Sequence, residues 1–222
     1  EQLFAHLKQA HPALVLLNIG GIANVSVLSD QPLVGFDTGP GNVLMDVWLQ
    51  QHHPELLFDQ GGALAASGRV NNALLTQMLN DPYFTKPAPK STGRELFNLA
   101  WLNRHLSHFT ELSFVDMLAT LSQLTAESIA KSLAHLPNGL LLVCGGGAKN
   151  TLLLSHLQNH LPQWHIKLTS HVGIDADFME AMAFAWLAKQ CLERQSGNDP
   201  KVTGASRHEI LGQICQIKHH DW

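Results

Sequence analysis

The stretch that decides the fold runs from residue 14 to residue 28 and reads LVLLNIGGIANVSVL. An apolar run over residues 14–19 stops at two glycines, and residues 24–28 then alternate between apolar and polar side chains. Short runs of this kind, bounded by glycine, are typical of β-strands. The stretch therefore predicts two antiparallel strands joined by a turn at Gly20 and Gly21.

The rest of the chain continues as an α/β alternation with a helical middle. We expect further strands at residues 32–36, 140–144 and 164–168, and helices at residues 2–10, 43–51, 63–79, 118–136, from 151 onward and 178–194. Strands that alternate with helices are typical of α/β domains, and the long helical stretch between them indicates an insertion. Residues 196–200 (SGNDP) form the best linker, ahead of a tail.

The composition excludes two classes of partner. The 222 residues contain 14 Lys and Arg against 18 Asp and Glu, a formal charge of −4, and no window concentrates basic side chains. Nucleic acids and anionic membranes attract proteins through clustered Lys and Arg, so neither is an expected partner. The 45% share of hydrophobic residues excludes a disordered chain. No apolar run approaches the roughly 20 residues that a membrane span needs.

Cysteine and histidine usage indicates a reduced compartment. The three cysteines are Cys144, Cys191 and Cys215. They are odd in number, widely separated and outside any C-x-x-C motif, which favours a cytoplasmic protein. The 14 histidines include His52-His53 and His219-His220, but neither pair has a third ligand at helical or hairpin spacing. A surface role is therefore favoured over metal binding for both pairs.

Asp37 is the most informative single residue. It stands where an apolar strand ends and the glycine-rich segment 38–42 begins, and ligands bind at the carboxyl ends of strands in α/β sheets. A carboxylate there can act as general base or hold a cation that bridges phosphate oxygens. Alternatively, Asp37 caps the following turn or helix by accepting a backbone N–H. The local sequence favours neither role over the other.

Two glycine clusters are candidate anion sites. Gly20 and Gly21 join the first two strands, and Gly145 to Gly147 connect a strand to a helix. Glycine has no Cβ, so an anion can approach its backbone N–H, and a helix start adds partial positive charge. The triple glycine matches neither a P-loop nor the G-x-G-x-x-G motif. Tight turns and close helix packing explain such glycines equally well.

The polar segment KSTGRE at residues 90–95 is a further candidate. Arg94 can form two hydrogen bonds with a carboxylate or a phosphate, while Thr92 and Glu95 can bind sugar hydroxyls. The alternative is a capping box, because Thr92 and Glu95 have the S/T-x-x-E spacing that opens a helix at residues 96–106. Glu180 starts the Ala-rich helix and is a further candidate, because it can face a cleft; alternatively, it simply complements the helix dipole.

Taken together, ordered segments of the chain resemble the anhydro-N-acetylmuramic acid kinase family. The main segments are NIGGIAN at 18–24, GFDTGPGN at 35–42, KSTGRELFN at 90–98 and VCGGGAKN at 143–150. Shorter matches are DQGGA at 59–63, ASGRVN at 66–71, MEAMAFAWL at 179–187 and VTGA at 202–205. The motifs keep a consistent order and spacing over nearly the whole chain, which makes the resemblance far more specific than any single motif.

The resemblance implies a fold and an activity. The fold would be a ribonuclease-H-like lobe with a mixed sheet, as in the sugar kinase, actin and Hsp70 superfamily. The activity would be ATP-dependent phosphorylation of 1,6-anhydro-N-acetylmuramic acid with hydrolytic opening of its anhydro ring, giving N-acetylmuramic acid 6-phosphate in peptidoglycan recycling. Mg²⁺ is expected because it neutralises the β,γ-phosphate charge during transfer. A homodimer is also implied.

The matching motifs imply roles for particular residues. Asp37 would be the catalytic base that activates water for attack on the anomeric carbon. The nucleotide would be bound by Gly20, Gly21, Asn24, Gly145, Gly146, Gly147 and Asn150. The sugar would be bound by Thr38, Gly39, Asn42, Thr92, Arg94 and Glu95. Capping remains a sufficient explanation of Thr92 and Glu95, and the sequence assigns no residue to a metal.

One departure from the family's pattern concerns the first lobe. The family opens with a G-T-S-x-D-G phosphate hairpin, which this chain lacks. The resemblance then places residues 1–13 in the last helix of that lobe, residues 14–196 in the second lobe, and residues 197–222 in a tail that packs on the first lobe. We expect the chain alone to be inactive, because phosphoryl transfer depends on positioning by both lobes. The alternative function is a non-catalytic single-lobe module for nucleotide binding, sugar binding or assembly.

Overall fold

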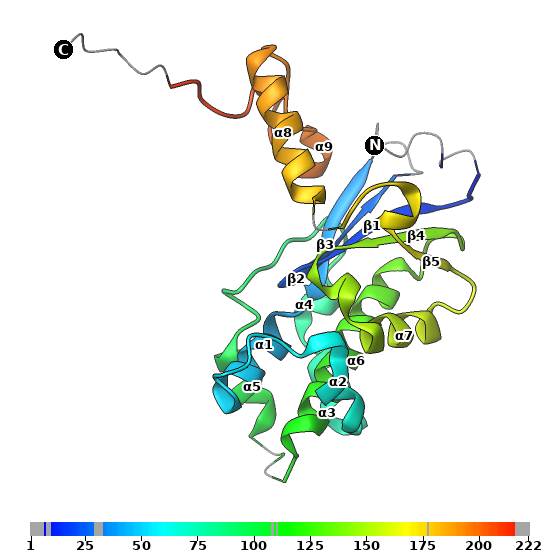
Figure 1. Cartoon of the computed structure of the whole chain (residues 1–222), viewed down its shortest axis with the longest axis vertical. Helices are drawn as coiled ribbons and strands as arrows, with labels where there is room; N and C mark the ends of the chain where they lie inside the picture. The colour runs from blue at the N-terminus through cyan, green and yellow to red at the C-terminus, as the bar shows by residue number, and fades with distance from the viewer. Residues whose placement is uncertain are drawn as a thin grey trace, which may run out of the picture.

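The computed structural model describes residues 7, 10–28, 33–107, 109, 111–176 and 178–215. The helix expected at residues 2–10 lies mostly outside these ranges, and so do residues 216–222 of the tail. The described residues form one sheet with helices packed on it, a helical extension below it, and a separate helix that projects from its upper end (Figure 1).

Five strands form the sheet in the order β3-β2-β1-β4-β5. They are β1 (Leu14–Ile19), β2 (Ile22–Val27), β3 (Val34–Pro40), β4 (Leu140–Cys144) and β5 (His165–Leu168). Strands β1, β2 and β3 pair antiparallel through short connections, whereas β4 lies parallel to β1 and β5 parallel to β4. The predicted α/β class and mixed sheet are confirmed, and the strand order is that of a ribonuclease-H-like lobe.

Strands β2 and β3 differ from the prediction at both ends, and β5 begins one residue later than predicted. Strand β2 begins at Ile22, because its pairing with β1 starts directly after the two glycines. Strand β3 does not end before Asp37 but continues to Pro40, because it keeps pairing with β2 beyond an irregularity. Asp37 therefore lies inside a strand, which corrects its expected position at a strand end.

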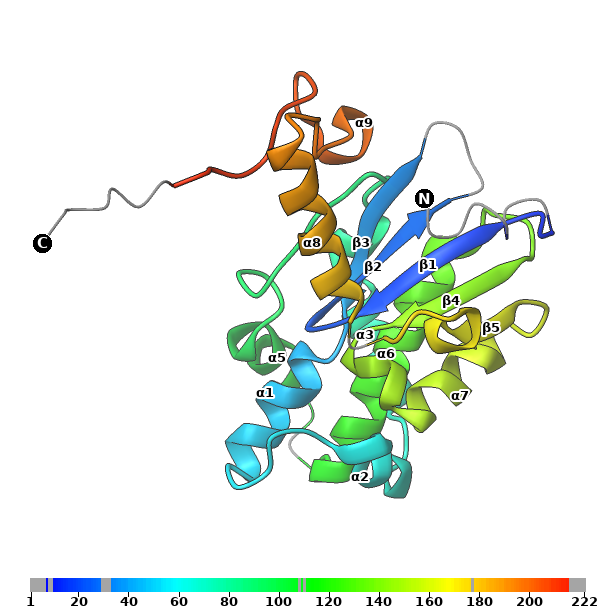
Figure 2. The same ribbon diagram turned by 45° about the horizontal axis from the view of Figure 1, so that its top comes forward.

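One face of the sheet is covered by α6 (Phe114–Leu133) and α7 (Thr151–His160) (Figure 2). Successive side chains of a strand point to opposite faces, so alternate residues of β1, β2 and β4 enter this core. The buried residues include Val15, Leu17, Ile19, Val25, Leu141, Val143, Ile129, Leu133 and Leu157. This packing fixes which residues face the other side of the sheet.

A second apolar core holds the helical insertion. The insertion comprises α1 (Val43–His52), a 3₁₀ turn η2 (Gln60–Gly62), α2 (Ala63–Ser67), α3 (Asn72–Leu79), α4 (Pro82–Thr85) and α5 (Leu99–Leu106). These elements pack on the N-terminal half of α6, and Tyr83, Phe97 and Trp101 are fully buried among them. Aromatic side chains of this size contribute much of the apolar area that a core buries.

The helical pattern predicted over residues 63–79 is two helices in the structure. Gly68 ends α2, and a Cβ at this position would collide with the main chain of Val115 in α6. Asn71 then starts α3 by accepting a hydrogen bond from the Leu74 N–H at 3.0 Å. The close approach to α6 and a new N-cap explain the break.

Two further helices lie beyond the sheet. Helix α8 (Met179–Leu192) begins on the face opposite α6 and α7 and has no buried residue, and α9 (Pro200–Thr203) lies against β3, where Val202 approaches Gly35 (Figures 1 and 2). Two 3₁₀ turns, η3 (Gly146–Lys149) and η4 (Thr169–Val172), follow β4 and β5. Among the described helices, none is long and apolar enough to cross a membrane.

Candidate active site

A row of polar residues crosses the face of the sheet that α6 and α7 leave uncovered. The strand registers pair Asp37 with Asn24, Asn24 with Asn18, and Asn18 with Cys144. Directly paired residues on adjacent strands lie side by side on one face. The apolar remainder of this face, with Leu14, Leu140 and Leu142, packs against Val172, Ile174 and Met179. The polar row therefore marks the part of the sheet suited to a ligand.

An irregularity in β3 gives Asp37 its place in this row. The register shifts between Ala23, which pairs with Gly39, and Asn24, which pairs with Asp37, so Thr38 is one extra residue in β3. A bulge of this kind redirects neighbouring side chains. Thr38 is fully buried, and its Oγ1 donates a hydrogen bond to the Ala23 oxygen at 3.1 Å.

The bulge corrects two predicted sugar contacts. The Thr38 hydroxyl is committed to the strand, and Gly39 has a φ of +151° with Phe84 and Ser128 packed against it. A Cβ on Gly39 would stand 2.8 Å from Phe84 Cε1. Thr38 and Gly39 thus shape β3, and their positions do not present them to a ligand beside Asp37.

Three hydrogen bonds hold Asp37 in place. Its N–H donates to the Lys90 oxygen at 2.9 Å, and its main-chain oxygen accepts from the Tyr83 hydroxyl at 2.7 Å. The Thr92 N–H donates to Asp37 Oδ2 at 2.9 Å. The segment that contains Lys90 and Thr92 therefore runs along the outer edge of β3 and engages one carboxylate oxygen.

Burial raises the pKa of the Asp37 carboxyl above its ordinary value. The hydrogen bond from the Thr92 N–H opposes this by lowering the pKa, and the negative charge of Glu95 raises it. A carboxylate with a raised pKa is a better proton acceptor near neutral pH. Asp37 is thus equipped for general-base work, and Oδ1 is the oxygen that Thr92 leaves open.

The capping-box interpretation of Thr92 and Glu95 is wrong. Helix α5 begins at Leu99, and its cap is Asn98, whose Oδ1 accepts a hydrogen bond from the Trp101 N–H at 3.1 Å. Thr92 instead has a buried Oγ1 that finds no hydrogen-bond partner among the described residues. A buried hydroxyl without a partner costs free energy, so it favours a ligand or water beside Asp37.

The glycine hairpin between β1 and β2 is fastened to the start of α1. The Gly20 oxygen accepts from the Asn42 N–H at 2.8 Å, and the Gly21 oxygen accepts from the Gly41 and Val43 N–H groups at 2.9 and 3.0 Å. The Gly21 N–H shares a trans peptide with the Gly20 C=O and points in the opposite direction. Because the Gly20 oxygen faces the start of α1, the Gly21 N–H points away from α1. Within the described ranges, that N–H has no acceptor.

The triple glycine packs against the end of β1. Gly145 has a φ of +80°, and a Cβ there would collide with Asn18 Oδ1. A Cβ on Gly147 would collide with Ile19, while Gly146 lies close to the Asn42 amide. Close packing is therefore a sufficient reason for two of the three glycines. Gly146 is the one that faces a cavity.

That cavity has a volume of about 300 Å³ and lies where α1, η2 and η3 meet. Its walls are Asn42, Met45, Asp46, Phe58, Asp59, Gly61, Gly146, Lys149 and Asn150. A cavity that combines apolar side chains, here Met45 and Phe58, with several polar groups is suited to a small polar ligand. Asn150 also caps α7, its Oδ1 accepting from the Leu153 N–H at 3.0 Å. Three predicted site residues, Asn42, Gly146 and Asn150, thus line one cavity.

Asp46 and Phe58 are residues of this cavity that the sequence analysis missed. Burial raises the pKa of Asp46 to about 6, against the opposing effect of the positive charge of Arg94. Asp46 follows Asn42 by one helical turn, and residues four apart share a helix face. That spacing was the available signal for Asp46, whereas nothing local marks Phe58.

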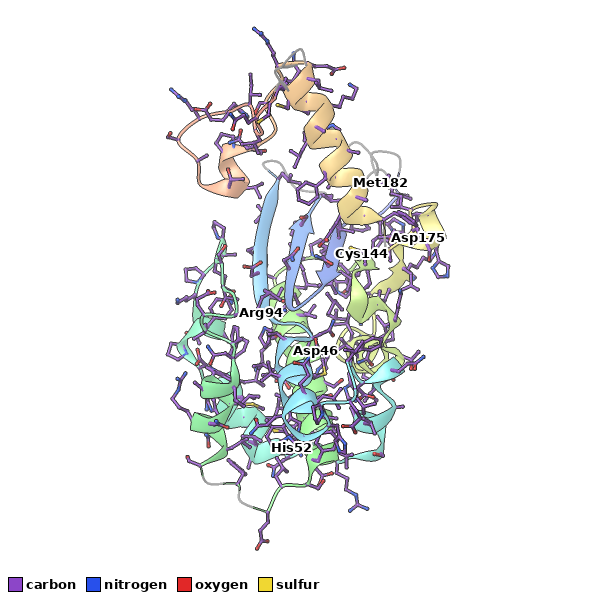
Figure 3. The ribbon with its side chains drawn as sticks, turned by 60° about the vertical axis from the view of Figure 1, so that its left-hand side comes forward. Asp46, His52, Arg94, Cys144, Asp175 and Met182 are labelled. Carbon is purple, nitrogen blue, oxygen red and sulfur yellow. The ribbon has the colours of Figure 1, made fainter. Side chains whose placement is uncertain are left out.

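Arg94 lies over the glycine hairpin. A Cβ on Gly21 would stand 3.8 Å from Arg94 Nη2. Figure 3 shows Arg94 and Asp46 below the strands, at the end of the sheet where α1 begins. Arg94 is exposed, and Glu95 folds back against Gly93. Arg94 is thus nearer the hairpin than its predicted role as a sugar ligand implies.

Glu180 and Asn24 complete the predicted set. Glu180 lies in the first turn of α8, and its negative charge adds to burial in raising the pKa of the Cys144 thiol to about 11. This shift disfavours the thiolate, which is the nucleophilic form of cysteine. Asn24 lies beside Asp37 in the polar row instead of at the glycine turns.

The described part of the chain offers no ready metal centre. No three His, Cys, Asp or Glu side chains within it cluster closely enough to hold an ion. His52 Nδ1 lies 2.9 Å from the Trp48 oxygen, and His53 Nδ1 lies 3.1 Å from Glu55 Oε1. Both are local contacts of α1 and its end, and the second histidine pair lies outside the described residues.

The order of the sheet, with three antiparallel strands followed by two parallel ones, defines the class of the chain as a ribonuclease-H-like lobe. A sequence model of the family described as anhydro-N-acetylmuramic acid kinase matches residues 1–217. The chain belongs to this family.

Curated relatives agree with the family model. The chain is 49% identical over 214 residues to the anhydro-N-acetylmuramic acid kinase of Pasteurella multocida, covering 95% of the chain and 56% of that protein. It is 51% identical over 204 residues to the enzyme of that name from Vibrio parahaemolyticus, covering 90% and 55%. The chain thus spans just over half the length of the curated relatives it matches.

Two solved structures are distantly similar. One is the activator of 2-hydroxyisocaproyl-CoA dehydratase from Clostridium difficile, with bound ADPNP, at a TM-score of 0.42 and 16% identity over 69% of this chain and 53% of that one. The other is component A of (R)-2-hydroxyglutaryl-CoA dehydratase from Acidaminococcus fermentans, at a TM-score of 0.45 and 15% identity over 69% and 54%. Similarity at this level carries no argument about function.

Proposed function

We propose that this chain is one lobe of a cytoplasmic enzyme that phosphorylates 1,6-anhydro-N-acetylmuramic acid with ATP and hydrolyses its anhydro ring. The product is N-acetylmuramic acid 6-phosphate, formed in peptidoglycan recycling. Family membership supports the reaction. The observation that carries the proposal is the carboxylate of Asp37, held with one oxygen open on the free face of the sheet.

Asp37 is the general base in this proposal. A water molecule attacks the anomeric carbon and gives its proton to Asp37 Oδ1, and the bond from that carbon to the 6-oxygen breaks. The 6-oxygen takes the γ-phosphoryl group, and ADP leaves. The Thr92 N–H on Oδ2 orients the carboxylate, so one oxygen is presented to the water.

The sugar is placed next to Asp37 and Thr92. The Thr92 hydroxyl is buried beside the base and has no partner in the described structure, which supports a hydrogen bond to a substrate hydroxyl or to the attacking water. Glu95 stands close enough to influence the Asp37 carboxyl, so it lies at the same end of the site. Glu180 approaches the opposite end of the polar row, near Cys144.

The nucleotide is placed in the cavity lined by Asn42, Gly146 and Asn150, with its phosphates toward Gly20 and Gly21. The side chains of Met45 and Phe58 in the cavity wall suit an adenine ring, and the glycine hairpin leaves the Gly21 N–H directed away from α1. Mg²⁺ would neutralise phosphate charge when bound. The described residues offer no cluster of metal ligands, so we assign none to the ion and route no step through it.

Helix α8 supports the proposal that a second lobe completes the enzyme. None of its residues is buried, and Phe178, Phe184 and Leu192 are 61%, 70% and 69% exposed. Apolar patches of this kind mark interaction surfaces. We place this face, with the tail from residue 197, against the first lobe.

A homodimer, implied by the family, is a separate proposal that light scattering on the full-length protein tests.

The test is turnover by the full-length protein and by its Asp37→Asn variant. Wild type should convert the anhydro sugar and ATP to the 6-phosphate and ADP, and the variant should lose about 10³-fold or more in kcat because it lacks the base. Near-normal turnover by the variant would exclude Asp37 as the base. If wild type binds ATP or the sugar by isothermal titration without turnover, the alternative of a binding module is supported.

A further inference from the structure

Arg94 and the glycine hairpin form a pair of hydrogen-bond donors that the sequence analysis did not bring together. Arg94 Nη2 would stand 3.8 Å from a Cβ on Gly21, so the guanidinium lies directly against the turn. Within the described residues, the guanidinium has no hydrogen-bond acceptor, and the Gly21 N–H has none either. A guanidinium without an acceptor beside a glycine turn favours an anionic ligand with several acceptor oxygens.

Asp46 is placed to hold the guanidinium there. Val43 flanks the other side of Gly21, its Cβ also 3.8 Å from the position of a Gly21 Cβ. Asp46 follows Val43 by three residues on α1, and residues three apart lie on one helix face. The positive charge of Arg94 acts to lower the pKa of the Asp46 carboxyl, as expected for an electrostatic attraction between the two side chains.

The segment that carries Arg94 also connects this place with the base. Thr92 donates its N–H to Asp37, and Arg94, two residues later, reaches the hairpin. A group transferred from a nucleotide at Gly21 to a sugar at Asp37 has to pass between these contacts. The segment that holds the base at Thr92 thus also brings Arg94 to the hairpin where the phosphates are proposed to lie.

We propose that Arg94 binds the transferred γ-phosphoryl group of the nucleotide, with Asp46 as the residue that positions its guanidinium, and that Arg94 is not a sugar ligand. This inference rests on the proposed function for the identity of the reaction. A planar guanidinium offers two parallel N–H donors to phosphate oxygens, and such an arginine stabilises the charge that spreads over those oxygens during transfer.

Ligand binding by the full-length protein tests the phosphate contact without turnover. Isothermal titration compares wild type, Arg94→Ala and Arg94→Lys with ATP, AMP and the anhydro sugar. We expect Arg94→Ala to weaken ATP binding about tenfold and to leave AMP and the sugar within about twofold. Arg94→Lys keeps the charge without the planar fork, and we expect it to recover only part of the loss. Arg104→Ala, an exposed arginine on α5, is the matched control.

Steady-state kinetics then separates the two roles. Arg94→Ala should lower kcat about 10²-fold or more, with the KM for the sugar within about twofold. A sugar KM raised tenfold with unchanged kcat and ATP affinity would overturn the inference and restore the sugar role. If wild type has no turnover while Arg94→Ala still weakens ATP binding, the proposed reaction fails and the phosphate role of Arg94 stands.

A double-mutant cycle tests the positioning role of Asp46. Asp46→Asn alone should lower kcat about tenfold, and on the Arg94→Ala background it should have almost no further effect, because it acts through the arginine. Additive losses in kcat would overturn the positioning role. Melting temperatures of all variants show whether a loss reflects unfolding, and Arg94→Lys keeps the test available if Arg94→Ala does not fold.

Discussion

The hydroxyl of Tyr83 lies 2.7 Å from the main-chain oxygen of Asp37 and donates a hydrogen bond to it. Tyr83 is 2% exposed and belongs to the apolar core of the helical insertion. Burial raises the pKa of this phenol, and the Asp37 charge raises it as well, so the hydroxyl keeps its proton. The insertion core is thereby joined to the residue proposed as the base.

Replacing Tyr83 by Phe should therefore disturb activity more than the fold. The variant keeps the ring but leaves the Asp37 oxygen without its donor, which should cost about 1 kcal/mol of stability. We expect kcat to fall about fivefold to tenfold, because a small displacement of the Asp37 carboxylate lowers the rate of the chemical step. Thermal unfolding and steady-state kinetics of the full-length protein measure both quantities.

Trp101→Phe is the matched control for this prediction. Trp101 lies in the same core and donates its indole N–H to Asp81 Oδ2 at 2.8 Å, but it does not touch Asp37. It should show a comparable loss of stability with kcat nearly unchanged. Equal kinetic losses in both variants would mean that Tyr83 acts only through the stability of the insertion.

The pH dependence of kcat/KM should report the environment of Asp37. The pKa of this carboxyl is raised by burial, so the acid limb of the profile should lie above the usual range for aspartate. Glu95 contributes to this rise through its negative charge. Glu95→Gln should therefore move the acid limb to lower pH.

Glu193→Gln serves as the control for the pH profile. Glu193 follows α8 and pairs with Lys189 at 2.8 Å on the surface of that helix, so its loss should leave the limb in place. An acid limb that does not respond to Glu95→Gln, or that survives in a residually active Asp37→Asn variant, would show that another group controls the profile.

The contact between the glycine hairpin and α1 gives a prediction about Gly41. A Cβ at this position would collide with the Gly20 oxygen, which is main chain and cannot move aside easily. Gly41→Ala should destabilise the protein by about 1–3 kcal/mol and weaken ATP binding, because the hairpin must shift. Gly20→Ala meets its nearest atom at 3.7 Å and should cost much less stability. Equal melting temperatures for the two variants would contradict this account.

The sequence predicted the sheet well because its strands carry local signals. Residues 14–19 are apolar except for Asn18 and end at two glycines, and β1 has these bounds in the structure. The helices of the insertion were harder to predict. The break between α2 and α3 depends on the close approach of Gly68 to α6, which lies far away in the sequence. Local pattern cannot register such a contact.

The candidate site also combines features that have a local signal in the sequence with features that depend on distant residues. Asp37 was predicted from its place after an apolar run, but its three hydrogen bonds come from residues 83, 90 and 92, far along the chain. The capping-box prediction for Thr92 was wrong because the Thr92 N–H donates to Asp37 Oδ2. Helix α5 is capped by Asn98 instead. Spacing alone cannot decide between a local and a tertiary partner for the same group.

Asp46 gives the last prediction, in which stability and activity change in opposite directions. Burial raises the pKa of its carboxyl to about 6 in the folded protein, from an ordinary value of 3.8. A raised folded pKa means that the folded state favours the protonated form. The contribution of Asp46 to stability is therefore fully present below about pH 4 and is lost as the pH rises through about 6.

Asp46→Asn removes this titration and keeps the shape of the side chain. At pH 8 the variant should melt a few degrees higher than wild type, about 2–4 °C for each kcal/mol gained, and at pH 4 the two should melt together. Its kcat should nevertheless be lower at pH 8, because the variant lacks the negative charge that we propose positions Arg94 beside Gly21. A variant that is less stable than wild type at pH 8 would mean that the attraction of Arg94 outweighs the cost of burying the carboxylate.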